Sequence, residues 1–425
     1  MVVIRFAKAV KNNPKKSIAG AIVLAWFGKW AEKRYIAHLF RRAECQTAVK
    51  LGQKSLHELQ DAKRVTVLLN PAANGGKANA LYEKYAAPIL HLAGYDVHLV
   101  KLNYEGEAKK LMSVVNNDID MIICAGGDGT LSEIVTGLMR RPDSNWKKIP
   151  IGIIPLGKKN TMCRRLIQNA DHDKQPHFIC SAASAITRSI QTPVDVMKID
   201  GSTGKTVYAV SSISWGTYSD LQDRIKKFWF LGPLKSYIPF VLSLLKSDPT
   251  KPRTFSISYT DPEVVPISLE ENCVENSSGL SVSSLLSKIF YRFWPWKSKS
   301  EPLIEQTAEL IEENWNDLPK TSIEFFAQAN KHLNSEGREK ASIQVQLESN
   351  NVSYTDFVTH GPFIFQKGDH PFVNTDSDFE VDKLKLSSQL SDNYEQHISI
   401  DNDRYEAMDL SVQLVPNCIN MICSK

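Results

Sequence analysis

Short apolar runs alternate with helical patterns over the first 195 residues of the chain. The apolar runs have the length and continuity of strands that are buried on both faces of a sheet. Between them, apolar residues recur at helical spacing, as in Glu107–Val115 and Leu131–Leu138. Strands that alternate with helices predict a doubly wound parallel sheet, which binds ligands beyond the carboxyl ends of its strands. The expected strands are Val65–Leu69, Asp96–Lys101, Met121–Ala125, Pro150–Gly157 and Pro193–Ile199.

After residue 196 the pattern changes to short strands with alternating polar and apolar residues, which is typical of a β-sandwich. These strands are Thr206–Ser212, Thr254–Tyr259, Ser322–Gln328, Ser342–Leu347, Glu395–Ile400 and Leu410–Val415. The apolar, aromatic segment 228–245 interrupts them, and it is read either as the wall of an acyl-chain pocket or as a buried core helix.

The chain therefore divides into three parts. Residues 1–60 form a basic N-terminus with an apolar helix at about 15–34, and residues 61–195 form an α/β nucleotide-binding domain. Residues 196–425 form a β-sandwich lipid-binding domain with an insertion at about 262–320, and its last strands are candidates for a return to the first domain.

The turn after Met121–Ala125 carries the first candidate for chemistry. Gly126, Gly127 and Gly129 surround Asp128, and a helical pattern follows. Glycines let an anion approach backbone amides, and the positive end of a helix favours a phosphate. Thr130 with Glu133 fits a capping box, so we expect the helix to begin at Thr130. A carboxylate beside a phosphate site is repelled unless a metal lies between them or the carboxylate serves to take a proton. Asp128 is therefore the candidate catalytic base.

Two further turns repeat this arrangement. Asn70, Gly75, Gly76 and Lys77 follow the strand Val65–Leu69, and Gly157 with Lys158 and Lys159 follows the strand that begins at Pro150. Lys77 offers a point charge to a phosphate, whereas Lys158 and Lys159 are either phosphate contacts or solvated loop charges. Three such turns predict one shared nucleotide cleft, with Thr130 at its edge.

Three other carboxylates are candidates for a metal site or a second acid or base. Asp195 lies inside an apolar strand, where it either pairs with a cation or supports the site. Asp401 and Asp403 lie at the end of a late strand, where the alternative is ordinary turn chemistry.

The N-terminus concentrates positive charge. Residues 1–43 contain ten Lys and Arg residues and one acidic residue, Glu32, a net charge of +9, so the remaining chain carries 4 − 9 = −5. The apolar stretch from Ser17 has 12 uncharged residues before Lys29, fewer than the ~20 of a spanning helix. Flanking cations and aromatic residues favour a mitochondrial address or an interfacial anchor over a buried helix.

The insertion offers a second candidate contact with lipid. Residues 285–299 interleave aromatic and cationic side chains, as a membrane-binding segment does. A platform for single-stranded nucleic acid would have a similar composition, but the sequence indicates no other basic groove, so no nucleic-acid partner is expected. Seven cysteines without a C-x-x-C pair indicate neither a disulfide framework nor a zinc site.

With these residues in view, the chain resembles the superfamily of diacylglycerol kinases and sphingosine kinases, and within it the acylglycerol kinases. The resemblance rests on the basic, apolar start and on a series of motifs. These are Asn70-Pro with Gly75-Gly-Lys77, Ala87-Pro-Ile-Leu-His-Leu, Tyr104-Glu-Gly, Ala125-Gly-Gly-Asp-Gly-Thr-Leu131, Ile153-Ile-Pro-Leu-Gly157, Val194-Asp195-Val, Leu231-Gly-Pro-Leu-Lys235 and Tyr405-Glu-Ala-Met408.

The resemblance implies an ATP-dependent lipid kinase that phosphorylates monoacylglycerol and diacylglycerol with Mg²⁺. It also implies a place at the mitochondrial inner membrane, on the intermembrane-space side, as a subunit of the carrier translocase. In some relatives the base is the aspartate of the glycine loop, which is Asp128 here. In others it belongs to a late Asp-Gly-Glu turn, which resembles Asp401-Asn402-Asp403.

Two departures from the family pattern leave alternatives open. Relatives carry Leu-Gly-Thr-Gly-Asn where this chain has Leu156-Gly-Lys-Lys-Asn160, so Lys158 and Lys159 either reduce activity or hold phosphate. The alternatives to an active kinase are a mainly structural translocase subunit and a soluble nucleotide or sugar kinase. The apolar segment 228–245 argues against the soluble kinase.

Overall fold

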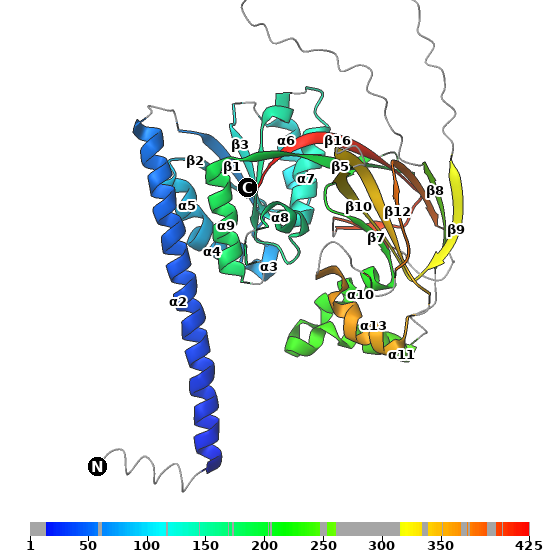
Figure 1. Ribbon diagram of the computed structural model, residues 1–425, viewed down its shortest axis with the longest axis horizontal. Coiled ribbons are helices and arrows are strands. Elements are labelled where there is room, and N and C mark those ends of the chain that lie inside the picture. The colour runs from blue at the N-terminus through cyan, green and yellow to red at the C-terminus, as the bar shows by residue number, and fades with distance from the viewer. Residues whose placement is uncertain are drawn as a thin grey trace, which may run out of the picture.

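The computed structural model of the chain contains an α/β unit and a β-sandwich that share one long sheet (Figure 1). The structure describes residues 14–57, 62–115, 118–143, 145–168, 170–171, 174–202, 204, 206–246, 253–260, 315–333, 339–350, 352–366, 372, 375–388, 397–401 and 403–424. The predicted lipid contact at 285–299, and with it most of the insertion at 262–320, lies outside these residues.

Four parallel strands form the part of the sheet that carries the predicted turns. Their order is β2 (Asp96–Lys101), β1 (Arg64–Leu69), β3 (Met121–Gly126) and β4 (Ile151–Pro155). β3 and β4 are buried along their whole length. Helices α6 (Glu107–Val114) and α7 (Asp128–Met139) pack together beside the sheet, and α5 (Ala87–Leu92) and α9 (Gln175–Arg188) form another group (Figure 1).

The rest of this sheet is antiparallel except where β16 meets β4, so the prediction of a doubly wound parallel sheet is correct only in part. β16 (Leu410–Ile422), from the end of the chain, lies beside β4 and pairs in antiparallel orientation with β5 (Gln191–Gly201). These two long strands run through both units. The alternation in Leu410–Val415 identifies a strand, but it holds no information about a partner more than 200 residues away in the chain.

The second unit is a β-sandwich, as the alternating strands predict. On one side, β13 (Lys383–Ser388), β8 (Arg253–Thr260), β9 (Asn316–Ser322) and β6 (Thr206–Ala209) extend the shared sheet. The facing sheet has the order β12 (Thr375–Val381), β11 (Glu339–Glu348), β10 (Glu324–Leu333), β7 (Ile213–Gly216), β14 (His397–Ile400) and β15 (Asp403–Glu406). Phe255 packs between Trp215 and Phe325, with ring centroids 5.4 and 6.1 Å apart.

The apolar segment 228–245 lies in a group of helices at one end of the sandwich. This group contains α10 (Thr217–Ile225), η3 (Lys226–Ser236), α11 (Ile238–Lys246), α13 (Tyr354–His360) and η4 (Gly361–Gln366). Phe240 is fully buried against Tyr218 and Phe357, whereas Leu245 is 78% exposed. The core-helix alternative is therefore correct for one side of α11, and the 490 Å³ cavity described below is lined by other elements.

The predicted apolar segment 15–34 is the first half of one 44-residue helix, α2 (Pro14–His57). The second half packs against α5 and α9 through buried Ala37 and Ala48, and Phe40 stacks on His177 with ring centroids 4.4 Å apart. The first half extends beyond the rest of the α/β unit (Figure 1). Among the described helices, none combines the length and apolar character needed to cross a lipid bilayer.

Candidate functional site

Three turns meet at the carboxyl ends of β1, β3 and β4. Asn70, directly after β1, joins the first two turns because its Nδ2 donates to Thr130 Oγ1 at 3.1 Å. Its Oδ1 accepts from the amide of Ala72 at 3.1 Å, and its own amide donates to Ala125 O at 3.1 Å. Asn70 thus fixes the first turn against the second.

The third turn rests directly on the backbone of the second. The amide of Gly157 donates to Gly126 O at 2.9 Å, and a Cβ atom at Gly157 would lie 2.4 Å from Gly127 Cα. No side chain fits at that distance, so this contact requires glycine. The side chain of Asn160 closes the turn, because it accepts from Gly157 N at 3.1 Å and donates to Gly157 O at 3.0 Å.

The first turn leaves open space above its glycines. It passes through α3 (Ala73–Gly76) with left-handed backbone at Asn74, Gly75 and Gly76, where φ is 53°, 67° and 84°. No atom lies within 4 Å of a Cβ built at either glycine, and Lys77 is exposed before α4 (Ala78–Leu81) and η1 (Tyr82–Ala86). Open amides next to a lysine suit the oxygens of a phosphate.

The predicted capping box at Thr130 and Glu133 is wrong. Helix α7 begins at Asp128 with Gly127 as its N-cap. Thr130 accepts the hydrogen bond from Asn70, and Glu133 Oε1 accepts from the amide of Gly106 at 2.9 Å. Partners from other turns have replaced the local contacts that the sequence pattern predicts.

Asp128 points from α7 to the first residues of α8 (Thr161–Leu166). Its Oδ2 accepts from the amide of Thr161 at 2.9 Å and its Oδ1 from the amide of Met162 at 3.3 Å. The residue is only 4% exposed. Burial raises the pKa of Asp128 above its usual value, while the two amides and the nearby Lys159 ammonium oppose that change. This carboxylate holds the third turn in place.

Asp401 is also buried and bound to backbone. It is 0% exposed and accepts from the amides of Val210, Ser211 and Ser212 at 2.8, 2.7 and 2.9 Å. Burial raises the pKa of Asp401 to about 7, although the amide donations oppose the change. Asp401 therefore anchors the β14–β15 turn to the connection between β6 and β7.

Asp403 is the acid of this turn that faces the glycine loop. A Cβ atom at Gly129 would lie 2.5 Å from Asp403 Oδ1 and 3.0 Å from Oδ2, so the carboxylate lies directly over that glycine. Asp403 is half-buried. The structure thus brings a carboxylate from the second unit to the first turn of α7.

Asp195 lies elsewhere. Its Oδ1 accepts from the amide of Asn417 at 2.7 Å, inside the bulge of β16, where Asn417 has φ 48°. The neighbouring Cys418 contacts Met139 at the opposite end of α7 from Asp128. Asp195 supports the pairing of β5 with β16 and is not brought to the glycine turns.

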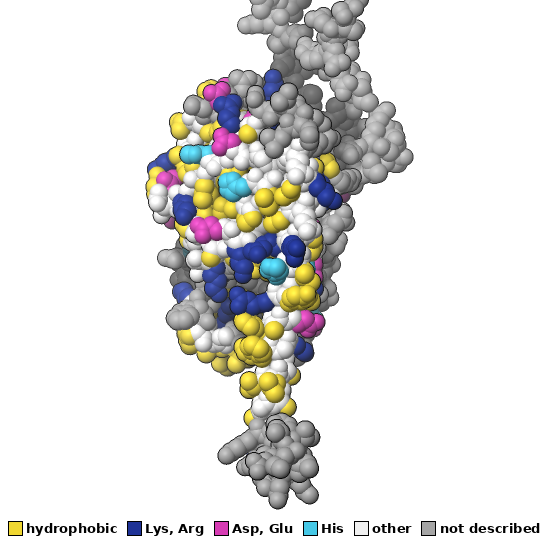
Figure 2. All heavy atoms as spheres, turned by 90° about the vertical axis from the view of Figure 1, so that its left-hand side faces the viewer, with side chains coloured by type: hydrophobic (Ala, Val, Ile, Leu, Met, Phe, Trp, Pro, Cys, Tyr) yellow, Lys and Arg dark blue, Asp and Glu magenta, His cyan; other side chains and the backbone are white. Residues whose placement is uncertain are grey.

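Positive charge gathers near the turns. Lys158 is exposed and Lys159 is half-buried close enough to Asp128 to affect its pKa. Figure 2 shows Lys and Arg side chains gathered on the face seen from the side of α2. Together with Lys77, Lys158 and Lys159 put positive charge at the carboxyl edge of the sheet, which favours a polyphosphate there.

A bound magnesium ion would need few protein ligands. No group of three or more His, Cys, Asp or Glu residues in the described part of the chain is arranged to hold a metal. Mg²⁺ beside a nucleotide usually takes one or two carboxylates, and phosphate oxygens and water complete its shell. The half-buried carboxylate of Asp403 fits that limited requirement.

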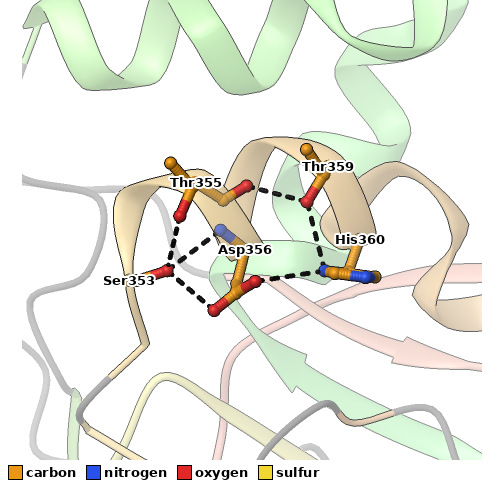
Figure 3. A network of polar contacts seen from close by, with 5 residues as sticks. All are labelled: Ser353, Thr355, Asp356, Thr359 and His360. Atoms are coloured by element: carbon orange, nitrogen blue, oxygen red, sulfur yellow. Dashed lines mark hydrogen bonds and ion pairs between the residues drawn. The ribbon is translucent and has the colours of Figure 1, made fainter.

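A Ser–Asp–His group on α13 has the composition of a catalytic triad without its geometry (Figure 3). Ser353 caps the helix, since its Oγ accepts from the amide of Asp356 at 3.1 Å and donates to Asp356 Oδ2 at 2.7 Å. His360 Nδ1 lies 3.5 Å from Asp356 and 3.1 Å from Thr359 Oγ1. The serine hydroxyl is directed to the carboxylate instead of the imidazole, so this group stabilises a helix end.

Sequence reasoning missed the backbone partners of these side chains. The amides of Val210–Ser212 fix Asp401, and the amide of Gly106 fixes Glu133, but backbone donors leave no trace in residue type. Asn160 was identifiable, because Asn in a turn commonly bonds local backbone.

Comparisons with known proteins identify relatives of both units. Residues 64–199 match the diacylglycerol kinase catalytic domain, and residues 210–425 match the acylglycerol kinase C-terminal family. The chain is 36% identical to the human "Acylglycerol kinase, mitochondrial" over 98% of this chain and 96% of the relative. It is 35% identical to the protein of the same name from Xenopus laevis, over 99% of this chain and 95% of the relative.

Two further similarities have lower sequence identity. Human sphingosine kinase 2 is 26% identical over 48% of this chain and 32% of that protein. A solved structure of a diacylglycerol kinase from Bacillus anthracis str. Sterne is 16% identical with a TM-score of 0.46, and covers 85% of this chain and 97% of that one.

Proposed function

The chain belongs to the acylglycerol kinase family, and from that premise we propose that it transfers the terminal phosphoryl group of ATP to monoacylglycerol and diacylglycerol. The products are lysophosphatidic and phosphatidic acid. The observation that carries this proposal is the position of Asp403 over Gly129, because a carboxylate there would serve as a proton acceptor beside phosphates bound at the start of α7.

Phosphoryl transfer requires positioning and charge neutralisation more than covalent chemistry by the protein. The open turn at Gly75 and Gly76, with Lys77, would hold phosphate oxygens, and the first amides of α7 point to the same edge. Lys158 and Lys159 would add positive charge there, in place of the second glycine of the family pattern. Magnesium, when bound, would neutralise the phosphates, and Asp403 would be one of its ligands or would lie beside it.

The lipid hydroxyl must lose a proton as it attacks, and the two candidate bases differ in their surroundings. Asp128 is buried, and both of its oxygens already accept from the amides of α8. Asp403 is half-buried and lies over Gly129. A base must reach the proton that it removes. We therefore propose that Asp403 removes the proton from the lipid hydroxyl and that Asp128 positions the third turn.

The test is a kinase assay with labelled ATP on the full-length chain. Monoacylglycerol and diacylglycerol in mixed micelles should each yield a labelled phospholipid, and omission of Mg²⁺ should abolish the product. Absence of labelled lipid with both substrates would overturn the kinase proposal in favour of a mainly structural protein. Label transferred instead to free nucleosides or sugars would support the soluble-kinase alternative.

We also place the protein at the mitochondrial inner membrane, on the intermembrane-space side. Exposed apolar side chains on two elements support a membrane contact. The first half of α2 exposes Trp26 by 68%, and Phe27 stacks on Trp30 with centroids 5.4 Å apart. Figure 1 shows this end of α2 on the same side of the molecule as α11, where Leu245 is exposed. Arg34 lies 4.9 Å from the centre of the Trp30 ring, as cations do at an interface.

Replacing Trp26, Phe27 and Trp30 with serine should lower binding to liposomes at least tenfold, because each buried aromatic side chain contributes about 1.5–3 kcal/mol. Flotation with vesicles that contain anionic lipid measures the effect. Leu92→Ser, which removes an exposed apolar residue of α5, serves as the control and should bind as the wild type does. Equal flotation of the triple variant would show that α2 does not contact lipid.

A second role as a subunit of the carrier translocase follows from the family resemblance. The exposed apolar half of α2 supports it, because it would present a surface to a partner within the membrane interface. The two roles separate experimentally. An Asp403→Asn chain should lose kinase activity and still co-purify with the translocase, whereas loss of both would show that association depends on the site.

A further inference from the structure

A cavity of about 490 Å³ lies apart from the three glycine turns. It is lined by α6, by Arg140 directly after α7, by strands β5, β6, β14 and β15, and by the segment that leads into β16. Its apolar lining comes from Ile199, Val207, Ile398, Ile400, Met408 and Leu410. This volume falls within the usual range of small-molecule pockets, which are mainly apolar with a few fixed polar groups.

Cations line one side of this cavity. Lys109, Lys110 and Arg140 all border it, and Glu406 is the acid among the lining residues. Arg140 is oriented by donating to Thr206 O at 2.6 Å, and Lys110 lies 5.1 Å from the centre of the Tyr104 ring. None of the three cations forms an ion pair with a carboxylate of the described residues. Burial raises the pKa of Glu133, and the nearby Lys109 ammonium opposes that rise. They form the cationic rim of the cavity.

The cationic rim is distant from the site of phosphoryl transfer. A Cβ atom at Gly137 would lie 2.5 Å from Lys109 O, so Lys109 lies next to that residue of α7. Gly137 comes eight positions after Gly129, which corresponds to about 12 Å along the helix axis. A neutral acylglycerol whose hydroxyl reaches Asp403 therefore gains nothing from these charges.

The apolar part of the cavity does approach the reaction site. Tyr405 lines the cavity, and it lies two residues from Asp403 on the same face of β15. Successive side chains of a strand alternate between faces, so Asp403 and Tyr405 are neighbours on one side. A chain that fills the cavity from the cationic rim would end beside the position of the lipid hydroxyl.

We propose that this cavity binds a single-chain lipid with an anionic headgroup, either a carboxylate or a phosphate monoester. The headgroup accepts charge-assisted hydrogen bonds from Lys109, Lys110 and Arg140, and the chain lies on the apolar lining. The binding rests only on the geometry of the cavity. Its consequence rests on the proposed function: the bound chain ends beside Tyr405 and competes with the acyl chain of the substrate, so anionic lipids inhibit the kinase.

The test measures binding directly. A fluorescent long-chain fatty acid is bound to the full-length chain and displaced by oleate, by oleoyl lysophosphatidate and by neutral monooleoylglycerol, each below its micellar concentration. Lys109→Gln/Lys110→Gln should raise the Kd of both anionic lipids about tenfold, or about 1.4 kcal/mol, and leave that of the neutral lipid unchanged. Ser113→Trp, an exposed α6 position in the lining, should weaken all three by filling the cavity.

Lys50→Gln on α2 removes an exposed lysine away from the cavity and should bind as the wild type does. Thermal melting checks that each variant is folded. Binding of either anionic lipid more tightly than the neutral lipid supports the site, and the tighter of the two anionic lipids identifies its headgroup. Unchanged anionic binding in the double lysine variant, or in Ser113→Trp, would overturn the proposal. If binding follows the expected pattern and no lipid is phosphorylated, the proposed function fails and this site stands. If lipid is phosphorylated but the variants bind anionic lipids as the wild type does, this site is rejected and the proposed function stands.

Discussion

Replacing Asp403 with asparagine is expected to lower kcat by about 10²–10⁴, the usual contribution of a positioned general base. Asparagine keeps the size of the side chain over Gly129 but cannot take the proton of the lipid hydroxyl. The KM for ATP should change little, because the glycine turns that we propose as the phosphate site remain intact. Steady-state kinetics with monoacylglycerol, at several Mg²⁺ concentrations, measure both constants and separate a base from a metal ligand.

Asp128→Asn should affect a different constant. Its amide group would place a donor against the amide of Thr161 or Met162, and an unmade buried hydrogen bond costs about 1–3 kcal/mol. We therefore expect a raised KM for ATP and a lower melting temperature. Asp409→Asn, at an exposed carboxylate bonded to Ser387, is the control. If Asp128→Asn abolishes kcat at full stability while Asp403→Asn keeps its rate, Asp128 is the base.

Local patterns in the sequence were sufficient to identify the strands and turns of the α/β unit. β1 and β3 match, to within one residue, the ranges that continuous apolar runs predict, because a strand that is largely buried is recognisable without its partners. β2 occupies the predicted range Asp96–Lys101. The glycines at 126, 127 and 157 were also identifiable from the sequence, and at Gly127 and Gly157 close contact with backbone atoms leaves no room for a side chain. Their convergence follows from the parallel order of the strands alone.

Features that depend on distant partners could not be predicted from the sequence. Thr130 and Glu133 fit a capping box locally, yet Thr130 accepts a hydrogen bond from Asn70 and Glu133 accepts one from Gly106. Asp128 and Asp403 are both acids in turns, and only the fold shows that one binds the amides of α8 while the other faces Gly129. The direction of a side chain decides the role of each carboxylate, and residue type does not record direction.

Gly157→Ala should remove most kinase activity through packing alone. The added methyl group would lie 2.4 Å from Gly127 Cα and 3.0 Å from Lys159 O, and both of these are backbone positions that cannot rotate away. The third turn must therefore move off the second, which also breaks the hydrogen bond from Gly157 N to Gly126 O. Overpacking of this kind costs about 1–3 kcal/mol. We expect kcat/KM for ATP to fall at least 100-fold and the melting temperature to fall by several degrees.

The same substitution at Gly28 is the matched control, because no atom lies within 4 Å of a Cβ there. Gly28→Ala should keep full activity and stability. Gly129→Ala is a graded case: its methyl group meets the carboxylate of Asp403, which can rotate, so kcat should fall while ATP affinity is retained. Wild-type kinetics in Gly157→Ala would mean that the third turn does not need its contact with Gly127. Nucleotide binding would then depend on the first two turns, and Lys158 and Lys159 would act without a fixed loop.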